Sequence, residues 1–419
     1  MGRFDVKTPL RSNLHYFLKW TFISCVIGIA VGLVGAVFGR AITWVTTFWH
    51  DHSWTLFLAP AAGLAIVWLY RTFHEEGNRG TNLVLEAISA NEEVSLATAP
   101  LIFLGTLLTH FVSGSAGREG AALQLGGSLG NQLGKWMRLD EKDKKIAVMC
   151  GMSACFAALF GTPMAAGIFS LEVVSIGVLY YAALVPCVFA SFIGAAISRQ
   201  FGNLPEQFLL EGAPAFGISE AVFTVGFGVA CALVSVLFCI ILHQSEKLYR
   251  KYVPNSYLRI LAGSVLFVGL TLLVGNREYN GSGIHLVAEI MEGGQVSLFA
   301  FLLKMVFTAV ALGAGFKGGE IVPTLCVGAA FGAAVSQITG MDQALCAACG
   351  MAALFVGVTN CPIASVILAF EMFGYGAMPY FAIIVAVSFT LSGYYGLYKS
   401  QKFVYSKLKA EYINIRSHE

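Results

Sequence analysis

The apolar stretches of this chain follow one another almost without interruption, and this pattern limits the folds open to it more than any other feature. They centre near residues 30, 62, 104, 155, 185, 230, 265, 305, 330, 360 and 385. Only 12% of the residues are charged and 57% are hydrophobic, whereas soluble domains carry about 25% charged residues. Because so few polar residues cannot cover a water-facing surface, most of the surface must face lipid.

The lengths of these stretches predict helices of mixed length. Several apolar runs are too long for one membrane span of about 20 residues, and several are too short. About ten or more membrane helices, some broken or tilted, fit the pattern better than uniform spans. We therefore expect an all-α polytopic membrane protein with a single membrane domain over residues 1–419. The net charge of +2 argues against nucleic-acid binding.

Basic residues gather in a few loops and predict which side of the membrane those loops face. One cluster spans residues 135–145, a second spans 247–259, and a third lies in the short polar tail at 406–419. By the positive-inside rule all three are expected in the cytoplasm. The N-terminus leads with basic residues into an apolar run and shows no cleavage site, so we also expect it in the cytoplasm, with the protein multi-pass in the cell (inner) membrane.

The ten cysteines predict neither disulfides nor a metal site. Most lie within apolar runs, where a thiol behaves as a small buried hydrophobe. Cys346 and Cys349 form a C-x-x-C, but no second pair or neighbouring histidine completes a set of metal ligands. We therefore expect no metal and no cofactor.

The two halves of the chain resemble each other in sequence. CGMSACFAALFGTPMAAGIFSLE at 150–172 matches CGMAALFVGVTNCPIASVILAFE at 349–371. Two further pairs keep the same order: NLVLEAI with HLVAEIM at 82–88 and 285–291, and GSAGREGAALQLGGSLG with GAGFKGGEIVPTLCVGAAFG at 114–130 and 313–332. These matches indicate an internal duplication over roughly 15–200 and 215–400.

The charges predict how the two copies are oriented. The loop that follows the first Gly-rich segment carries five basic residues between Lys135 and Lys145, whereas the matching stretch from Gln337 carries only Asp342. Positive-inside bias therefore places the two loops on opposite sides of the membrane. This indicates an inverted repeat, which together with Gly-broken helices is typical of transporters whose site lies near the membrane midplane.

Gly117-Arg118-Glu119-Gly120 is the strongest candidate for a functional site. A charged pair between two apolar runs is costly in lipid and usually marks an ion or proton pathway. The flanking glycines favour a helix break, and the N–H groups at the start of the next helix can bind an anion. Ionised Glu119 would compete with that anion and protonated Glu119 would not, so one residue can couple protons to anions. The alternative is a structural Arg–Glu pair.

The matching segment of the second copy, GFKGGEIVP, again combines glycines, a basic residue and a glutamate. When the copies are aligned, Ile321 falls opposite Glu119 and Glu320 falls opposite Arg118, so the two carboxylates are not repeat equivalents. Two half-helix starts that point inward would build one anion pathway. A second carboxylate there repels an anion unless it is protonated or hydrogen-bonded. The alternative for Glu320 is an ion pair with Lys317.

A third Gly-polar segment precedes these motifs in each copy, as GNRGTN at 77–82 and GSGI at 281–284. Polar side chains in the first of these, Thr81 foremost and Asn78 second, are candidates to donate hydrogen bonds to an anion. The alternative is a plain loop.

These residues carry a family resemblance. The GREG motif, the GGEIVP segment, the duplication and Tyr405 in KFVYSKL resemble the CLC family of anion transporters over essentially the whole membrane domain. GSAGREG with GAGFKGGE is most similar to its fluoride-specific clade. The resemblance implies an inverted-repeat CLC-type architecture and a homodimer with one pathway per subunit in the lipid bilayer. It also implies proton-coupled antiport of fluoride, outward for H⁺ inward, which confers fluoride resistance, and no enzymatic activity.

The resemblance also implies roles for individual residues. Glu119 matches the gating glutamate that couples protons, and Glu320 matches the second glutamate of the fluoride clade. Tyr405 matches the tyrosine whose hydroxyl faces the central anion. The remaining residues expected to bind the anion are Thr81, Asn78, Arg118, Gly120, Phe316 and Ile321.

The chain departs from the chloride-type pattern of this family, which resembles GSGIP, GREGP and GxFxP. It has GNRGTN for the first motif, Ala121 after GREG, and Glu320-Ile321 in the third. Chloride/proton exchangers of the family carry an internal glutamate that transfers protons, and its position in this chain is occupied by Val173. We therefore interpret the neighbouring Glu172 as a structural residue. The alternative function is a chloride/proton exchanger or passive chloride channel. An intramembrane enzyme is disfavoured because His110, near GREG, has no nucleophile partner in the sequence.

Overall fold

The structure is a computed structural model that describes residues 10–90, 92–210 and 212–417. The first nine residues of the expected cytoplasmic N-terminus and the last two of the tail lie outside this range. The helices of the first half are α1 Leu10–Asp51, α2 Ala59–Thr72, α3 Thr81–Ala90, α4 Thr98–Phe111, α5 Glu119–Trp136, α6 Glu141–Phe160, α7 Pro163–Glu172 and α8 Leu184–Gln200. Those of the second half are α9 Ile218–Tyr252, α10 Ser256–Val274, α11 Ile284–Met291, α12 Ala300–Ala314, α13 Ile321–Thr339, α14 Gln343–Thr359, α15 Pro362–Phe373 and α16 Met378–Leu391.

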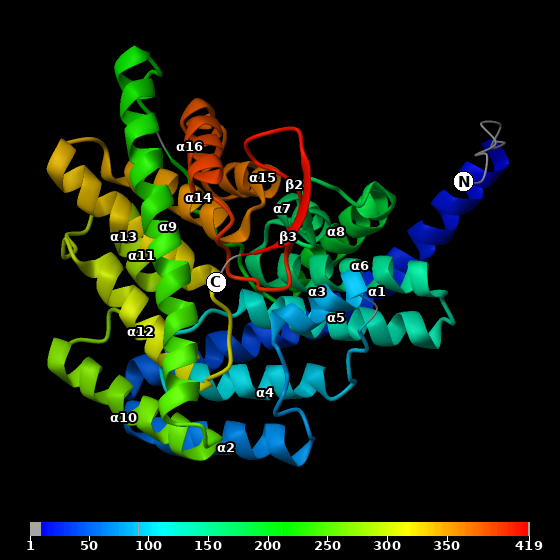
Figure 1. Ribbon diagram of the computed structural model, residues 1–419, viewed down its shortest axis with the longest axis horizontal. Coiled ribbons are helices and arrows are strands. Elements are labelled where there is room, and N and C mark those ends of the chain that lie inside the picture. Colours follow the sequence, from blue (N-terminus) through cyan, green and yellow to red (C-terminus); the bar gives the residue numbers. More distant parts are fainter. Residues whose placement is uncertain (1–9, 91, 211, 418–419) are drawn as a thin grey trace.

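The two halves therefore contain matching series of eight helices, and α1 to α8 correspond in order to α9 to α16 (Figure 1). Both series begin with an unusually long helix, of 42 and 35 residues, and each has a short helix in third place. The matched segments of the sequence fall on corresponding helices, α5 with α13 and α7 with α15. The order of the elements agrees with the duplication found in the sequence.

The helices differ widely in length, as the apolar runs predict. Within the described residues, six helical segments are long and apolar enough to cross a membrane: Ser12–Asp51, Ser53–Thr72, Tyr181–Gln200, Ile218–Tyr252, Ser256–Val274 and Ile321–Thr339. Five further apolar helices are only 10–17 residues long. The chain is thus a mostly helical, multi-pass membrane protein, and the predicted fold class is confirmed.

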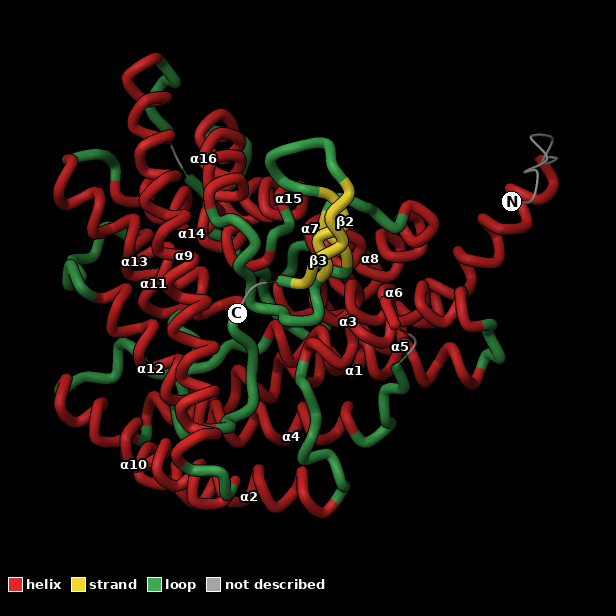
Figure 2. Tube along the Cα trace, viewed as in Figure 1, coloured by secondary structure: helices red, strands yellow, loops and turns green. Residues whose placement is uncertain are grey.

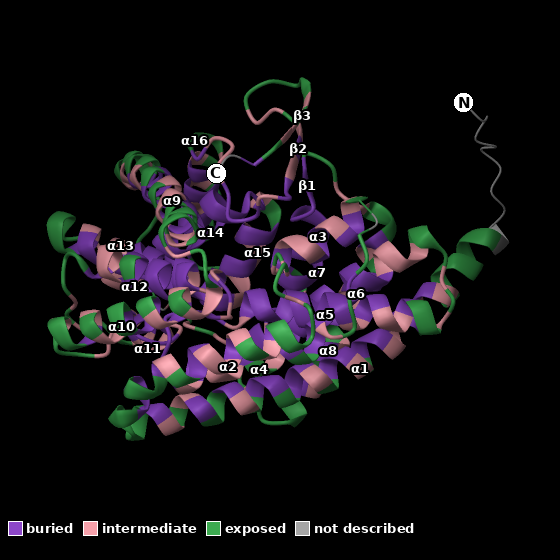
Figure 3. Ribbon diagram, turned by 60° about the horizontal axis from the view of Figure 1, so that its bottom comes forward, coloured by how far each residue is buried: buried purple, intermediate pink, exposed green. Residues whose placement is uncertain are grey.

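Most residues of α5, α6, α13 and α14 are buried, whereas the long helices α1, α9 and α10 carry many exposed residues (Figure 3). In the most apolar stretch of α13, 78% of the stretch is buried inside the protein, whereas the corresponding share in α10 is 28%. Leu273 of α10 and Trp44 of α1 are among the exposed large hydrophobic residues. Such side chains favour contact with lipid tails, which agrees with the low charge content.

Glycines allow close packing at the centre of each half. A Cβ at Gly126 of α5 would lie 2.2 Å from the carbonyl oxygen of Gly151 in α6. In the second half, a Cβ at Gly328 of α13 would lie 2.5 Å from the carbonyl oxygen of Gly350 in α14. Any larger residue would separate these helix pairs, so the same small-residue contact holds both copies together.

Matching residues also begin α6 and α14. Asp140 caps α6 by accepting hydrogen bonds from the N–H groups of Lys142 and Asp143 at 2.9 and 2.8 Å. Asp342 caps α14 by accepting one from the N–H of Leu345 at 2.7 Å. A carboxylate at this position satisfies N–H groups that have no partner within the helix.

The short helices α7 and α15 bind each other's starting turns. Glu172, at the end of α7, accepts hydrogen bonds from the N–H groups of Ile363 and Ala364 at 3.2 and 2.9 Å. Glu371, in α15, accepts them from Met164 and Ala165 at 2.9 and 2.8 Å. A carboxylate at a helix N-terminus is favourable. These contacts agree with a structural role for Glu172.

The tail folds back onto the first half rather than remaining a simple polar extension. Strands β2 Lys402–Tyr405 and β3 Tyr412–Arg416 form an antiparallel hairpin. The short β1, Ser175–Ile176, follows α7 and pairs with β2 in parallel (Figure 2). The segment between α16 and β2 consequently returns toward the interior of the molecule.

Candidate functional site

The broken segments that precede α5 and α13 meet at the centre of the molecule. The N–H of Gly117 donates to the carbonyl of Gly319, and the N–H of Gly319 donates to that of Gly117, both at 2.7 Å. From this point α5 and α13 extend toward opposite sides of the molecule (Figure 1). Two helix starts, each with N–H groups that lack helical partners, are therefore held side by side.

The close approach demands glycine. A Cβ at Gly120 would lie 2.7 Å from the Cα of Gly319, and a Cβ at Gly319 would lie 2.3 Å from the backbone nitrogen of Gly120. Both contacts are with backbone atoms, which cannot rotate away. The glycines of the two motifs thus let the two helix starts touch.

The register between the copies is the one predicted from the sequence. Glu119 is the first residue of α5 and Ile321 the first of α13, and Arg118 and Glu320 occupy the N-cap positions. Glu119 and Glu320 therefore differ by one position in the repeat. Since both lie at helix starts, both carboxylates reach the same central region from different copies.

Glu119 is fully buried and bound to its neighbour. One carboxylate oxygen accepts a hydrogen bond from the backbone N–H of Arg118 at 3.0 Å, and the other lies 3.3 Å from Nε of the same residue. The guanidinium group of Arg118 also donates to the carbonyl of Leu159 at 3.2 Å and forms an ion pair with Glu206. The expected Arg–Glu pair exists, but Arg118 is shared with a second carboxylate that the sequence did not suggest.

Glu320 has different surroundings. Among the described residues, no ion-pair partner of Glu320 is found, and the hydrogen bond at its carboxylate comes from its own backbone N–H. Its Oε2 lies 3.4 Å from the place that a Cβ of Gly120 would occupy, so the carboxylate points at the first turn of α5. Glu320 thus holds a negative charge where a bound anion would be favoured by the helix start.

The expected ion pair between Glu320 and Lys317 is not found in the part of the chain that the structure describes. The Nζ of Lys317 instead lies 4.1 Å from the centre of the Tyr70 ring. A cation over an aromatic face is a favourable arrangement that leaves Glu320 without a counterion. This alternative interpretation of Glu320 is therefore contradicted.

Glu320 lines a cavity of about 430 Å³ that also brings several of the predicted residues together. Thr81, Asn78 and Phe316 line the same cavity. Thr81 begins α3, and its hydroxyl donates to the carbonyl of Gly120 at 3.3 Å. The amide of Asn78 is engaged by Glu75 and Gly80 at 3.0 and 2.8 Å. Thr81 is consequently the better placed of the two candidates.

Two polar side chains of this site were missed in the sequence. Gln124, on α5, donates to the hydroxyl of Thr81 at 3.4 Å and lines the cavity. Tyr398 also lines it, is 2% exposed, and has a hydroxyl that is buried without a hydrogen-bond partner. It interacts electrostatically with both Glu320 and Glu119. A buried phenol normally finds a partner, so the Tyr398 hydroxyl is free to donate to a bound anion.

The structure does not bring Tyr405 to this site, and its predicted placement is wrong. Tyr405 lies on β2, is 45% exposed, and packs against Tyr412 with ring centres 6.0 Å apart. It lines a different cavity, beside Glu172. In a regular strand it would share the buried face of Phe403, but a register shift between the two residues turns it outward. The tyrosine at the site is Tyr398, in the irregular segment before β2.

The side chains of Arg118 and Ile321 do not line this cavity either. Arg118 forms an ion pair with Glu206 of the linker, the segment between α8 and α9 that joins the two halves. Ile321 is fully buried in the apolar core. His110 is buried, and its Nε2 has no hydrogen-bond partner among the described residues. These residues surround the meeting point, while the lining is provided by Glu320, Thr81, Phe316, Gln124 and Tyr398.

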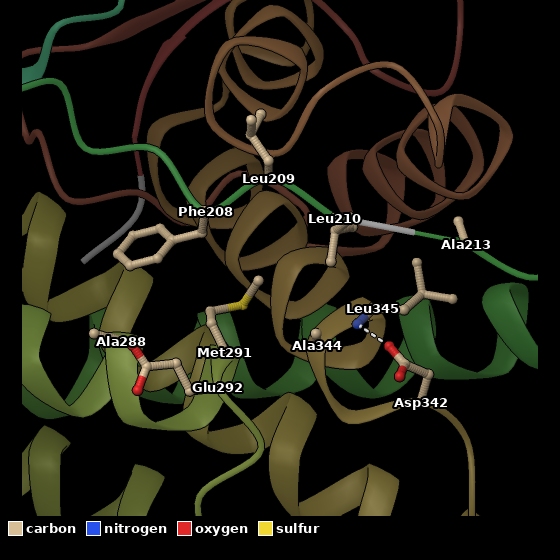
Figure 4. A pocket seen from close by; sticks show the side chains of 10 residues that line it. All are labelled: Phe208, Leu209, Leu210, Ala213, Ala288, Met291, Glu292, Asp342, Ala344 and Leu345. Carbon is tan, nitrogen blue, oxygen red and sulfur yellow. Dashed lines mark hydrogen bonds between the residues drawn. The ribbon is translucent and has the colours of Figure 1, made fainter.

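A second cavity, of about 380 Å³, lies apart from both glutamates (Figure 4). Phe208, Leu209 and Leu210 of the linker border it on one side and Met291 of α11 on another, and Asp342 caps α14 at its edge. Its lining is mostly apolar. Within the described ranges, no group of three or more His, Cys, Asp or Glu side chains could hold a metal ion.

Two broken helices that meet inside a membrane, with a carboxylate at each start, define the class of ion-transporting membrane proteins. The family model described as "Voltage gated chloride channel" matches residues 62–393. The chain therefore belongs to the CLC family, whose members transport anions and are not enzymes.

Comparisons with known proteins agree with this assignment. The chain is 31% identical over 400 residues to a "Chloride/fluoride channel protein" of Pseudomonas syringae pv. tomato, covering 94% of this chain and 88% of the relative. It is 27% identical to an "H(+)/Cl(-) exchange transporter ClcA" of Vibrio cholerae, covering 84% and 81%. A crystal structure of "a CLC-type fluoride/proton antiporter" is 31% identical, covers 92% of this chain and 98% of that one, and superposes with a TM-score of 0.88.

Proposed function

We propose that this CLC protein exports fluoride in exchange for protons. The observation that carries the proposal is Glu320, a carboxylate that forms no ion pair with any described residue and points at the start of α5. It lies in the cavity of about 430 Å³, which we call the inner cavity. A fixed negative charge there excludes anions while it is ionised. A protonated carboxyl is instead a hydrogen-bond donor at the place where the anion must pass.

Fluoride is the anion that gains most from such a donor. It is small, strongly hydrated and a strong hydrogen-bond acceptor, so a site must replace its lost water with compact donors. Protonated Glu320, the amide of Gln124 and the hydroxyl of Tyr398 supply donors of this kind around one cavity, and Thr81 accepts a hydrogen bond from Gln124. The names of the Pseudomonas relative and of the antiporter structure support the same ion.

Glu119 supplies the coupling in this proposal. While ionised it is held by Arg118 against the start of α5, and after protonation it loses the attraction of that cation and leaves the helix start to the anion. One proton is thereby bound or released each time the anion replaces the Glu119 carboxylate at the helix start, or is replaced by it. The proposal also includes a homodimer with one pathway per subunit, in the cell membrane.

We further propose that the inner cavity opens to the cytoplasm and that both termini lie there. Arg79, Arg250 and Arg416 line this cavity, and two of them belong to the basic clusters at 247–259 and in the tail. Basic residues mark the cytoplasmic side of membrane proteins. The basic rim would also raise the local concentration of anions at the entrance.

Purified protein in liposomes tests the proposal directly. A fluoride gradient should drive proton movement in the opposite direction, and chloride at the same concentration should drive far less. Chloride-driven proton movement equal to that of fluoride would instead indicate a chloride/proton exchanger. Anion flux with no proton movement would indicate a passive channel.

A further inference from the structure

The linker between the two halves carries a carboxylate that binds the arginine of the gate. Glu206 forms an ion pair with Arg118, although the two are 88 residues apart in the chain. The same guanidinium lies 3.3 Å from Glu119 through its Nε. One cation is thus shared between two carboxylates, only one of which belongs to the repeated motif.

Glu206 is held rigidly at this place. Its backbone N–H donates to the carbonyl of Phe160, the last residue of α6, at 3.1 Å. Pro205 before it fills the space beside Gly161, where a Cβ would lie 2.4 Å from that of the proline. These contacts fix the backbone of Glu206 beside the end of α6, within reach of Arg118.

The linker is anchored to the second half as well. The N–H groups of Phe208 and Leu210 donate to the carbonyls of Met372 and Phe373, at the end of α15, at 2.8 and 3.1 Å. The side chains of both linker residues face the cavity beside α11 (Figure 4). Glu206 therefore keeps a fixed distance to the ends of both copies.

The pair is also largely withdrawn from water. The side chains of Arg118 and Glu206 are 16% and 20% exposed, and Glu119 is fully buried. Charges in such surroundings are screened less than those of surface pairs. A guanidinium that lost Glu119 without another carboxylate would be left as a poorly compensated charge, which is costly.

From this geometry we propose that Glu206 is a positioning residue for the gate. It holds Arg118 by a second ion pair, which weakens the hold of Arg118 on ionised Glu119 and keeps the guanidinium compensated when Glu119 leaves. The inference rests on the proposed proton-coupled transport, because it assigns regulation to the same gate.

Other charged and titratable groups lie around Arg118 and Glu119, and the experiment has to separate Glu206 from them. His110 of α4 interacts with Arg118 and with Lys304 of α12, and Tyr398, in the segment before β2, interacts with Glu119 and Glu320. None of these belongs to the linker. Glu206→Gln therefore removes one charge beside Arg118 and leaves the charges of these other groups unchanged.

The test is the pH dependence of fluoride-driven proton flux in liposomes for wild type and Glu206→Gln. Without the competing charge, Arg118 binds ionised Glu119 alone, so more protons are needed to release it. The midpoint of the profile should shift to lower pH by about 0.5–1 unit, and the flux at pH 7 should fall by a factor of about three to ten and recover on acidification. Glu206→Asp should restore part of the shift.

Glu220→Gln is the matched control, because Glu220 lies just beyond the same linker, at the start of α9, and forms no ion pair among the described residues. It should keep the wild-type midpoint. In a Glu119→Gln background, Glu206→Gln should shift no midpoint of the anion flux, because the group that titrates is gone. The same shift in that background would show that Glu206 acts on another group and would overturn the proposal.

The outcomes separate this inference from the proposed function. Wild-type protein without proton-coupled flux would overturn the proposed function itself. Coupled wild-type flux together with an unchanged or upward-shifted midpoint in folded Glu206→Gln would overturn the role of Glu206 alone. Size-exclusion profiles of each variant establish folding.

Discussion

The two helix starts at the centre of the molecule come from matching segments, yet they hold their glutamates in opposite ways. Glu119, the first residue of α5, is bound to an arginine that two further groups hold in place. Glu320, one position earlier at α13, has no counterion among the described residues and faces an open cavity. In the proposed mechanism, the first carboxylate is released on protonation and the second donates a hydrogen bond once protonated.

The third helices of the two copies, α3 and α11, also differ in the side chains at their starts. Thr81, at the start of α3, lines the inner cavity. The matching start of α11 is closed by the fully buried Lys304, whose ammonium donates to the carbonyls of Tyr279 and Gly281 at 3.0 and 2.8 Å and to Ser115 at 3.1 Å. The comparison shows how a duplicated framework can support an asymmetric pathway: backbone contacts are kept and side chains differ.

Neutralising the bound carboxylate should have the largest effect. Glu119→Gln retains the shape of the side chain but cannot exchange a proton, so proton flux driven by a fluoride gradient should fall by about 100-fold, a typical contribution of one proton-transferring group. Parallel measurement of anion and proton flux in liposomes checks this. A variant that still moves protons against fluoride would show that Glu119 is not the gate.

Neutralising the unpaired carboxylate should have the next largest effect. Glu320→Gln still donates a hydrogen bond from its amide but no longer responds to protons, so coupled exchange should fall by about tenfold, equivalent to one charged hydrogen bond. The same flux assay serves here. Equal rates in Glu320→Gln and wild type would remove the distinction between the two glutamates.

The contact between the two helix starts can be tested by filling it. Gly319→Ala should lower the stability by about 1–3 kcal/mol, as expected for overpacking against backbone. Gly226→Ala is the control, because nothing lies within 4 Å of its Cβ position on α9, and it should change stability by no more than about 1 kcal/mol. Thermal unfolding in detergent compares them, and equal melting temperatures would refute the close contact.

The reciprocal caps of α7 and α15 should respond alike. Glu172→Ala and Glu371→Ala each remove a carboxylate from the starting turn of the other helix, with an expected loss of about 1 kcal/mol. Glu172 is the more buried of the two, so its loss should be the larger. A loss confined to one variant would show that the two caps are not equivalent.

The smallest effect is expected at the start of α6. Hydrogen bonds from the N–H of Asp143 and then of Lys142 lower the pKa of Asp140 below its usual value. The cap therefore stabilises α6 above the ordinary aspartate pKa of about 3.9 and is lost as the pH falls through the lower folded value. Asp140→Asn should flatten this acid dependence slightly in unfolding curves, and an unchanged dependence would contradict the cap.

The sequence was most informative where function depends on neighbouring residues. The glycines at 117 and 120 predicted the helix break, and the aligned copies predicted that Glu119 and Glu320 are offset by one position. Both follow from local rules, because a helix start depends on the residues next to it. The inverted arrangement of the copies remains our proposal, supported by the divergence of α5 and α13 from their common meeting point.

The sequence failed where distant segments meet. Tyr405 was chosen from its motif, but a β-bulge turns it outward and the returning segment places Tyr398 at the cavity instead. Glu206 gave no signal at all, since it lies outside both copies and its partner is 88 residues away in the first copy.

The sequence by itself determined that this is a membrane protein, and it predicted a duplication and two candidate glutamates, because hydropathy, repeats and helix starts are properties of contiguous residues. Only the tertiary structure decided which groups those glutamates face. Counterions and hydrogen-bond partners are selected by packing between segments far apart in the chain, and a single register shift or linker contact is enough to exchange one partner for another.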